Sequence, residues 1–375
     1  MTRIKTALVG YGKVAHLHAQ ALAAIPEAEF VAVWGRNMNR AEAFARQYGV
    51  HAYTDLSAMI REREVQAVIV CTPHPAHVGP TVEAASRGVH VLVEKPLAST
   101  LTDCDRMIDA ARAAGVKLGV ISQRRFYEPV RRVREAIDAG KIGTPVLGTV
   151  VMYGWRDEAY YRSDPWRGQW EAEGGGVLVN QAPHQLDLLQ WFMGPIDEVF
   201  GYWGNLNHPY IEVEDTAVAV IRFKSGGLGS IVVSNAQKPG IYGKIHVHGS
   251  NGASVGVQPE GGAMFIAGMS TVLEPPINDL WTVPGEEGLL AQWQAEDRAA
   301  FERVDPTVHY LMLQDRDFLQ AILEDRPPAV TGEEGRVTVE LFTAIYRAQR
   351  DRAPVKFPVP AEDGAADFDG RLSTP

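Results

Sequence analysis

Residues 4–15 read IKTALVGYGKVA, an apolar run that ends at two closely spaced glycines and continues into a helical pattern. This pattern predicts a buried strand over residues 4–9, a tight turn and then a helix. Gly10 permits the turn, Gly12 lets the backbone approach a pyrophosphate, and Ala15 allows the helix to pack closely on the strand. Because a helix N-terminus attracts phosphate, the turn predicts a dinucleotide site. The residues that we predict to bind the dinucleotide here are Gly10, Gly12, Lys13 and Val14.

The second predicted strand, residues 29–34, ends where a dinucleotide-binding domain often carries an acidic residue that accepts from the ribose 2′-hydroxyl. This chain has no carboxylate there, and Arg36 and Arg40 lie on either side of Asn37. Arginine suits a 2′-phosphate, so the sequence favours NADP over NAD, with Arg36 and Asn37 as cofactor contacts. The alternative is that both arginines are solvated and that NAD binds through the backbone and Asn37.

Short apolar runs alternate with helical patterns as far as residue 121, which predicts parallel βαβ units. The residues after the predicted strand 67–71 should line the cofactor cleft, because ligands bind beyond the carboxyl ends of such strands. Cys71 fits a small buried thiol better than a nucleophile, since nothing nearby in sequence supplies a base at a catalytic spacing. The predicted cofactor contacts in this stretch are Cys71, Thr72, Pro73, His74 and His77.

The next apolar run, Val91-Leu92-Val93, is followed by Glu94-Lys95-Pro96. Pro96 fixes its own φ and pushes Lys95 out of the helical region, and a cis bond between them would hold the lysine at a set angle. Lys95 therefore lies where a cofactor and a small substrate could meet, with Glu94 as a further cofactor contact. The alternative is an exposed lysine at the end of a strand.

The pattern changes after the predicted strand 117–121, and Gln123, which leaves this strand, is another predicted cofactor contact. Long β-rich stretches with glycine turns follow, which predicts an antiparallel sheet. We therefore predict an α/β fold with a dinucleotide-binding domain at residues 1–122 and a second α/β domain at residues 123–375. The predicted strands of the second domain span 146–154, 196–204, 216–223, 228–234 and 241–248, and its predicted helices span 129–139, 287–301, 307–323 and 333–350.

Residues 173–187 read EGGGVLVNQAPHQLD and lie between the first two strands of the second domain. A helix is predicted to follow as far as Trp191, and Asn180 and His184 share a face if this helix extends back to Asn180. His184 can accept and return a proton near neutral pH, which is what a dehydrogenase requires of a base. It can also be a structural histidine at a helix start, and Asp187 on the same face can equally fix the fold.

An aromatic-rich loop, residues 155–168, interleaves tryptophans and tyrosines with arginines and acids. Such a loop suits either a hydroxyl-rich ligand such as a sugar or a contact between subunits, and the sequence leaves both open. The residues that we predict to hold substrate hydroxyls are Arg124, Tyr153, Arg156, Arg167, Asn180 and His309.

Composition limits the classes of partner. The formal net charge is -10 and no basic cluster is present, which argues against nucleic acid. Cys71 and Cys104 are the only cysteines, which favours a reducing cytoplasm, and no apolar run approaches the ~20 residues of a membrane helix. His246 and His248 lack a third ligand at suitable spacing, so no metal site is predicted.

Together these motifs resemble the glucose–fructose oxidoreductase / inositol dehydrogenase (Gfo/Idh/MocA) family over nearly the whole chain. The resemblance is carried by Gly10-Tyr11-Gly12, by Cys71-Thr72-Pro73, by residues 88–98 with Glu94-Lys95-Pro96, and by Gly174-Gly175-Gly176 leading to His184 and Asp187. It implies a Rossmann domain and a second domain whose open, mostly antiparallel sheet forms a homodimer or homotetramer contact. It also implies reversible hydride transfer between NAD(P) and a carbinol carbon of a sugar or cyclitol.

One residue departs from the family pattern, since many members carry an aspartate where this chain has Asn180. Asparagine can orient a hydroxyl but cannot accept its proton, so the base role falls on His184 with Lys95. Subgroups similar to this pattern oxidise a sugar 3-hydroxyl and include glucoside and levoglucosan dehydrogenases and nucleotide-sugar 3-dehydrogenases. Aromatic cis-dihydrodiol dehydrogenases also look like it.

Three other interpretations stay open. The first is a cyclitol dehydrogenase. The second is a dehydrogenase of a carboxylated cyclic diol, for which Arg156 or Arg167 would bind the carboxylate bidentately. The third is a regulator that binds the dinucleotide without chemistry, and such a protein would not require Lys95 and His184 together.

Overall fold

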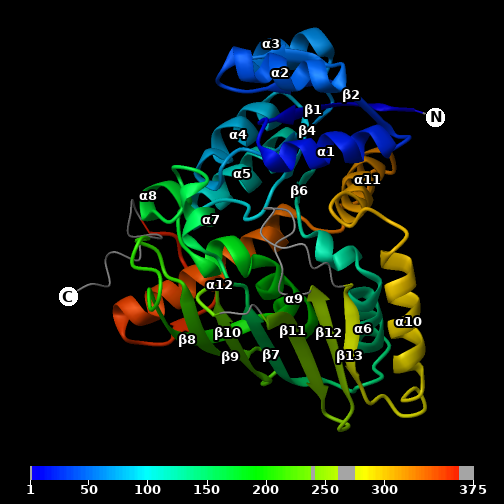
Figure 1. Ribbon diagram of the computed structural model, residues 1–375, viewed down its shortest axis with the longest axis vertical. Helices are drawn as coiled ribbons and strands as arrows, with labels where there is room; N and C mark the ends of the chain where they lie inside the picture. The colour runs from blue at the N-terminus through cyan, green and yellow to red at the C-terminus, as the bar shows by residue number, and fades with distance from the viewer. Residues whose placement is uncertain (1, 238–240, 261–274, 363–375) are drawn as a thin grey trace. The chain divides into compact units, whose positions relative to one another are not determined.

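The computed structural model describes residues 2–237, 241–260 and 275–362 (Figure 1). The chain forms two compact units. Unit 1 comprises residues 1–123 and 306–339, and unit 2 comprises residues 124–305 and 340–375. Each unit contains one of the two sheets, so the predicted α/β class is confirmed.

Unit 1 holds a six-stranded parallel sheet with the order β3-β2-β1-β4-β5-β6. This is the strand order of a Rossmann fold. The sequence order of the strands across the sheet reverses between β1 and β4. Its strands are β1 (Ile4–Val9), β2 (Ala28–Trp34), β3 (His51–Tyr53), β4 (Ala67–Val70), β5 (His90–Val93) and β6 (Leu118–Val120). Its helices are α1 (Lys13–Ala24), α2 (Met38–Tyr48), α3 (Leu56–Arg63), α4 (Val78–Ser86), α5 (Leu101–Ala114), α11 (His309–Leu323) and the first part of α12 (Gly332–Asp351).

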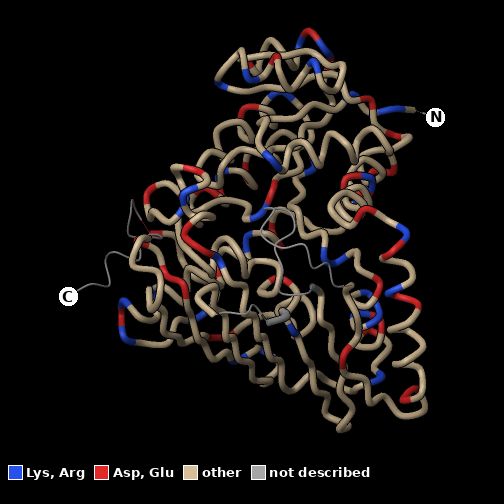
Figure 2. The backbone as a smooth tube through the Cα atoms, in the orientation of Figure 1, with Lys and Arg blue, Asp and Glu red and all other residues tan. Residues whose placement is uncertain are grey.

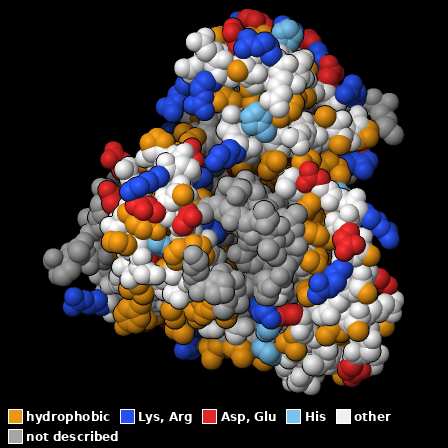
Figure 3. All heavy atoms as spheres, in the orientation of Figure 1, with side chains coloured by type: hydrophobic (Ala, Val, Ile, Leu, Met, Phe, Trp, Pro, Cys, Tyr) orange, Lys and Arg blue, Asp and Glu red, His pale blue; other side chains and the backbone are white. Residues whose placement is uncertain are grey.

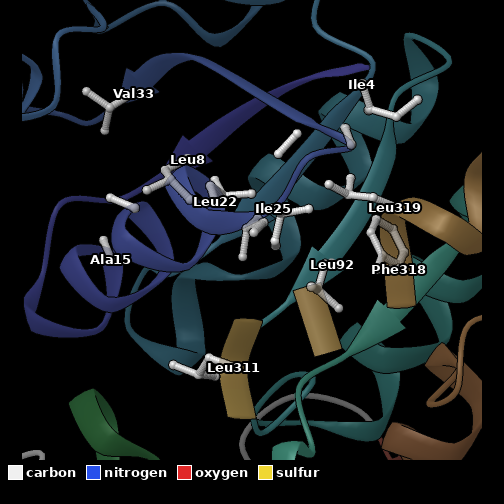
Figure 4. Packing of buried hydrophobic residues seen from close by; sticks show 14 of the residues in the cluster. Ile4, Leu8, Ala15, Leu22, Ile25, Val33, Leu92, Leu311, Phe318 and Leu319 are labelled. Atoms are coloured by element: carbon white, nitrogen blue, oxygen red, sulfur yellow. The ribbon is translucent and has the colours of Figure 1, made fainter. Parts of the chain in front are cut away.

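A hydrophobic core joins β1, α1 and α11 within unit 1 (Figure 4). Leu8 and Leu22 are buried in the same cluster as Leu311, Phe318 and Leu319 of α11. The sequence predicts the helix of α11 but carries no signal that it completes the core of the first sheet. The predicted division of the chain at residue 122 does not anticipate this return.

Unit 2 holds an eight-stranded sheet with the order β13-β12-β11-β7-β10-β9-β8-β14. All neighbours are antiparallel except β7 and β10, so the mostly antiparallel sheet is confirmed. The strands are β7 (Pro145–Tyr153), β8 (Ile196–Gly204), β9 (Thr216–Phe223), β10 (Leu228–Ser234), β11 (Ile241–Gly249), β12 (Ser254–Glu260), β13 (Ile277–Trp281) and β14 (Val355–Lys356). The last three strands are not predicted from the sequence. β14 is very short, and β13 carries Asn278 and Asp279 among its apolar residues.

Helix α9 (Pro183–Met193) packs against β7 and β11. A Cβ on Gly148 of β7 would lie 2.7 Å from Cγ of Met193, so glycine is what allows this close approach. The other helices of unit 2 are α6 (Glu128–Asp138), α7 (Glu158–Arg162), α8 (Trp170–Glu173), α10 (Leu289–Phe301) and the rest of α12. The short helices α7 and α8 lie in and just after the aromatic-rich loop, where the sequence does not predict them.

Charge is distributed along both units. Acidic and basic side chains are interspersed along the backbone (Figure 2). Within the described residues, none of the helices combines the length and the apolar character needed to span a bilayer.

Candidate active site

The turn between β1 and α1 has the backbone that a dinucleotide requires. Gly10 has a φ of 114°, and a Cβ there would lie 2.9 Å from the carbonyl oxygen of Cys71, so glycine is required. Gly12 is the N-cap of α1, no described side chain caps this helix, and a Cβ on Gly12 would meet no described atom within 4 Å. The N–H groups of the first turn, which includes Lys13 and Val14, can therefore donate to a phosphate. A dinucleotide fits these residues.

Tyr11 contacts the residues that follow β2, the position where Rossmann domains bind the adenosine ribose. Its ring packs on Gly35, since a Cβ on Gly35 would lie 1.9 Å from the ring. The Asn37 N–H donates to the Tyr11 hydroxyl at 3.2 Å, and the Arg40 guanidinium lies 4.9 Å from the centre of the same ring. The Asn37 side-chain oxygen accepts from the Arg40 N–H and caps α2, which leaves exposed Arg36 and Arg40 as the charged groups at this end.

His77 connects the loops that follow β4 and β5. Its ring is buried, with Nε2 2.8 Å from the Thr72 carbonyl oxygen and Nδ1 3.1 Å from that of Pro96. Burial lowers the pKa of His77 and raises the pKa of the Cys71 thiol. An imidazole held at both nitrogens by carbonyl oxygens and a thiol whose pKa is raised suit a cleft wall better than a catalytic pair. Pro73 precedes the short 3-10 turn His74–Ala76, and His74 is buried beside His77.

Lys95 is half-buried directly after β5, and its bond to Pro96 is cis. The main-chain N–H of Lys95 donates to Oε2 of Glu94 at 3.0 Å. Oε1 of Glu94 lies 3.2 Å from Nε2 of His18, and Nδ1 of His18 lies 2.8 Å from Oδ2 of Asp315. The sequence analysis singles out neither His18 nor Asp315, because the only sequence signal is a histidine on the buried face of a helix.

Gln123 is the first residue of a 3-10 turn that ends at Phe126. Its side-chain oxygen is buried and has no hydrogen-bond partner among the described residues. A buried acceptor of this kind suits an amide donor of a ligand, since leaving it unpaired is unfavourable. The predicted cofactor contact at Gln123 therefore has a physical basis in unit 1.

In unit 2, a buried carboxylate shapes the turn that precedes His184. His184 is buried in the first turn of α9, and Asn180 lies in a π-helical turn, Val177–Gln181, rather than in a continuous α-helix. The N–H groups of Gly176 and Leu178 donate to Glu214 at 2.8 and 3.0 Å. Burial raises the pKa of Glu214 to about 7, although its hydrogen bonds oppose this.

Asp187 is held by a buried bidentate ion pair with Arg125. Their two contacts are 2.8 and 2.7 Å long, and the Arg125 guanidinium also lies 4.8 Å from the centre of the Trp191 ring. Of the two roles that the sequence leaves open for Asp187, these contacts describe the one that fixes the fold.

Three of the predicted substrate residues meet at Tyr160, and we call Tyr160, Asn180, Arg167, Arg156 and Glu173 the Tyr160 cluster. Asn180 Nδ2 donates to the Tyr160 hydroxyl at 3.1 Å and to buried Glu173. Arg167 also donates to this hydroxyl, and its guanidinium lies 4.3 Å from the ring centre. Arg156 lies 5.4 Å from the ring centre and donates to the carbonyl oxygens of its own loop. The sequence analysis singles out neither Tyr160 nor Glu173.

The other predicted substrate residues, Tyr153, Arg124 and His309, belong to other elements. Tyr153 ends β7 and, by strand alternation, lies on the face opposite the one that Gly148 presents to α9. Arg124 is buried beside Arg125 at the start of unit 2. His309 begins α11 in unit 1, where its ring lies 5.0 Å from that of Tyr310.

The histidines of β11 have other partners. His246 Nε2 lies 2.9 Å from Asp279, and His248 Nδ1 lies 2.7 Å from the Ser254 hydroxyl. Over the described ranges of the chain, no group of three or more His, Cys, Asp or Glu residues could hold a metal ion.

The fold and the phosphate-binding turn define a dinucleotide-binding Rossmann protein. The sequence profile described as "Oxidoreductase family, NAD-binding Rossmann fold" matches residues 4–122, and the "GFO/IDH/MocA C-terminal domain" profile matches residues 130–255. The chain belongs to the Gfo/Idh/MocA family, as its motifs predict. It is an NAD(P)-dependent oxidoreductase.

The chain is similar to several named relatives over nearly its whole length. Myo-inositol 2-dehydrogenase of Thermotoga maritima is 28% identical over 361 residues, which covers 94% of this chain and 98% of the relative. The NAD-dependent scyllo-inositol 2-dehydrogenase of Bacillus subtilis is 25% identical over 363 residues, which covers 95% of this chain and 97% of the relative. The WlbA dehydrogenase of Bordetella pertussis, solved with NADH and UDP-GlcNAcA, is 30% identical, covers 96% and 99% of the two chains, and superposes with a TM-score of 0.84.

The contact between Asn180 and Glu173 gives a physical reason for asparagine at position 180. Asn180→Asp would place two carboxylates side by side in a buried site and raise the pKa of one of them. Its cost of about 1–3 kcal/mol should be present at pH 8 and decrease as the pH falls toward 5, because protonation removes the repulsion. Urea unfolding at both pH values measures it.

The double variant Glu173→Gln/Asn180→Asp should recover most of this stability, since the glutamine amide can donate to the new carboxylate. Asn39→Asp, at an exposed position of α2, is the matched control and should lose no stability. Equal losses in the single and double variants would contradict this explanation.

Proposed function

We propose that the protein is an NAD(P)-dependent dehydrogenase of a secondary alcohol on a sugar or sugar derivative, with a 3-hydroxyl favoured. The observation that carries this proposal is the position of Lys95, half-buried and held through its main chain by Glu94, directly after an inner strand of the Rossmann sheet. Ligands bind beyond the carboxyl ends of such strands, so Lys95 lies at the edge of the sheet where a nicotinamide and a substrate bind in a dehydrogenase of this fold.

In the proposed reaction, His184 accepts the proton of the substrate hydroxyl. The Lys95 ammonium donates a hydrogen bond to the same oxygen and stabilises its developing negative charge. A bound nicotinamide dinucleotide supplies the hydride acceptor. Asn180 orients a substrate hydroxyl without taking its proton, because an amide has no basic site at neutral pH.

A sugar is the substrate class that the Tyr160 cluster supports. The cluster combines one aromatic ring with amide and guanidinium donors, and this combination suits a hydroxyl-rich ring. The solved relative that holds UDP-GlcNAcA supports a sugar derivative, whereas the two inositol dehydrogenases support the cyclitol alternative. A carboxylated or aromatic cis-diol is a weaker alternative, because Arg156 already donates to carbonyl oxygens of its own loop.

A substrate screen followed by nicotinamide absorbance tests the proposed function, with sugars, nucleotide sugars, inositols and cis-dihydrodiols as arms and with NAD and NADP in parallel. On the best substrate, Lys95→Ala and His184→Ala should each lower kcat by ~10²–10⁴-fold, because each removes a positioned acid–base group. The exposed residues Lys224 and His51 offer matched control variants, Lys224→Ala and His51→Ala, which should turn over normally. Normal turnover in both catalytic variants, or dinucleotide binding without oxidation of any alcohol, would contradict the proposal.

We also propose that NADP is preferred over NAD. The end of β2 carries Arg36 and Arg40 on either side of Asn37, and the Asn37 side-chain oxygen is already used to cap α2. Two guanidinium groups favour a 2′-phosphate over a ribose 2′-hydroxyl, since hydrogen bonds between charged groups are about twice as strong as neutral ones.

The double variant Arg36→Ala/Arg40→Ala should raise KM for NADP by about tenfold or more while KM for NAD changes by less than about threefold, because only the phosphate contacts are lost. Steady-state kinetics with both dinucleotides measure this. Arg46→Ala, an exposed change on the same helix, is the control. If the two KM values rise in parallel, or NADP is not used at all, NAD is the cofactor.

The open face of the second sheet supports a homo-oligomer. Its side chains Tyr202, Val218, Val220, Leu228 and Leu147 are large, hydrophobic and exposed. They belong to neighbouring strands β8, β9, β10 and β7, and Figure 3 shows hydrophobic side chains gathered over the region of β8 to β10. Exposed apolar side chains gathered on one face of a sheet are typical of an interface. We propose that a second copy of the chain covers this face.

We also propose that the enzyme works in the cytoplasm.

Val220→Lys should dissociate the oligomer into monomers, because burying an unpaired ammonium in the interface is strongly unfavourable. Light scattering coupled to gel filtration measures the mass of the 41.1 kDa chain and of its assemblies. Val220→Thr keeps the shape of the side chain and should leave the assembly intact. A wild-type monomer at micromolar concentration would contradict this proposal.

A further inference from the structure

A histidine buried between two carboxylates connects three distant segments of unit 1. His18 lies on α1, Glu94 follows β5, and Asp315 lies on α11. The side chains of His18 and Asp315 are fully buried, and Glu94 is 13% exposed. Both ring nitrogens of His18 face carboxylate oxygens, at 2.8 Å for Asp315 and 3.2 Å for Glu94. With both carboxylates ionised, each contact requires an N–H donor on the ring, which describes an imidazolium.

The surroundings favour a proton on this ring at neutral pH. Burial opposes the charge, but Asp315 and Glu94 outweigh it and raise the pKa of His18 to about 10. Burial also opposes the charge on Glu94, but the charges of His18 and Lys95 and the hydrogen bonds from both hold its pKa below the usual value. Burial raises the pKa of Asp315, although the charge and hydrogen bond of His18 oppose this. Burial also raises the pKa of the neighbouring Cys71 thiol and lowers the pKa of the neighbouring His77.

Glu94 links His18 to Lys95. One of its carboxylate oxygens faces His18, and the other accepts the main-chain N–H of Lys95 at 3.0 Å. A carboxylate held at both oxygens has a fixed rotamer, so the peptide plane from which the Lys95 side chain departs is fixed as well. The order of contacts is Asp315, His18, Glu94, Lys95, and the formal charges along it alternate and sum to zero.

We infer that His18 is a positioning residue for Lys95, acting through the Glu94 carboxylate, with Asp315 as the counter-ion that keeps the imidazolium in the buried site. This inference rests on the proposed function, because it gives the lysine a catalytic task. A catalytic group displaced by about 1 Å can lose ~10²-fold in rate, so a distant clamp of this kind acts on kcat. A purely structural role for His18 would instead change stability alone.

Two amide substitutions separate the two contacts of His18. Asparagine places its amide nitrogen near the position of Nδ1, which faces Asp315, and glutamine places its amide nitrogen near the position of Nε2, which faces Glu94. His18→Asn should therefore lose the Glu94 contact and lower kcat by about tenfold to a hundredfold. His18→Gln keeps that contact and should lose less than about threefold, with KM for the dinucleotide within about twofold in both.

Each variant is also made with Asp315→Asn, so that no unpaired buried carboxylate prevents folding, and the same order of kcat is expected in these double variants. His16→Asn is the matched control, because His16 lies on the same helix and contacts the Tyr48 hydroxyl instead. The inference is overturned if the two His18 variants have equal kcat values. It is also overturned if the loss of kcat in each variant simply parallels its loss of stability, measured as the urea midpoint.

The charge on His18 has its own test. The folded protein keeps this proton up to about pH 10, whereas an unfolded histidine releases it near pH 6.5. The stability that it contributes is therefore fully present below about pH 6.5 and is lost as the pH rises toward 10. Urea midpoints between pH 6.5 and 9.5 should fall more steeply for the wild type than for His18→Gln/Asp315→Asn. Parallel slopes would overturn the imidazolium clamp.

Lys95→Ala separates the proposed catalytic role of Lys95 from the proposed positioning role of His18. If this variant turns over normally, the catalytic role of Lys95 and the positioning role of His18 are both wrong, although the protein is still a dehydrogenase. If it is impaired while His18→Asn keeps a wild-type kcat, the proposed function stands and only the role of His18 is wrong.

Discussion

The close approach of two strand ends is the constraint on which unit 1 depends. The carboxyl ends of β1 and β4 are neighbours in the parallel sheet, and the turn after β1 passes so near the Cys71 carbonyl that Gly10 has no room for a Cβ. This is the point where the strand order reverses and a crevice opens for a ligand. The uncapped start of α1, the loop after β4 and the lysine after β5 all follow from this one arrangement of strand ends.

A second physical feature is common to both units: buried carboxylates hold main-chain N–H groups beside the candidate site residues. Glu94 accepts from Lys95, Glu214 accepts from Gly176 and Leu178, and Glu173 accepts from Gly168. Burying a carboxylate is unfavourable unless its oxygens are satisfied, so each of these acids constrains the backbone around it. The irregular segments that carry Lys95, Asn180 and Arg167 are thereby given fixed shapes without regular secondary structure.

Local patterns in the sequence predict much of the fold. The glycine turn, the alternation of strands and helices, and the long strands β8, β9 and β10 are encoded by neighbouring residues, and their predicted bounds agree with the structure to within about a residue. The short strand β14 and the helices α7 and α8 were missed, because two to five residues carry too little periodicity. The π-helical turn that contains Asn180 was missed for a different reason, since its shape is held by Glu214 from another segment.

By itself, the sequence determined the dinucleotide turn, the Glu94-Lys95-Pro96 element, the stretch around His184 and the family to which they belong. These features are contiguous, so their chemistry can be read from spacing alone. Only the tertiary structure decided that Asp315 lies against His18, that α11 completes the first core, that Asp187 pairs with Arg125, and that Asn180 faces Glu173. Except for Asn180 and Glu173, which are seven positions apart, these contacts join residues tens or hundreds of positions apart. A buried charge finds its partner through the packing of the whole unit rather than through any local pattern.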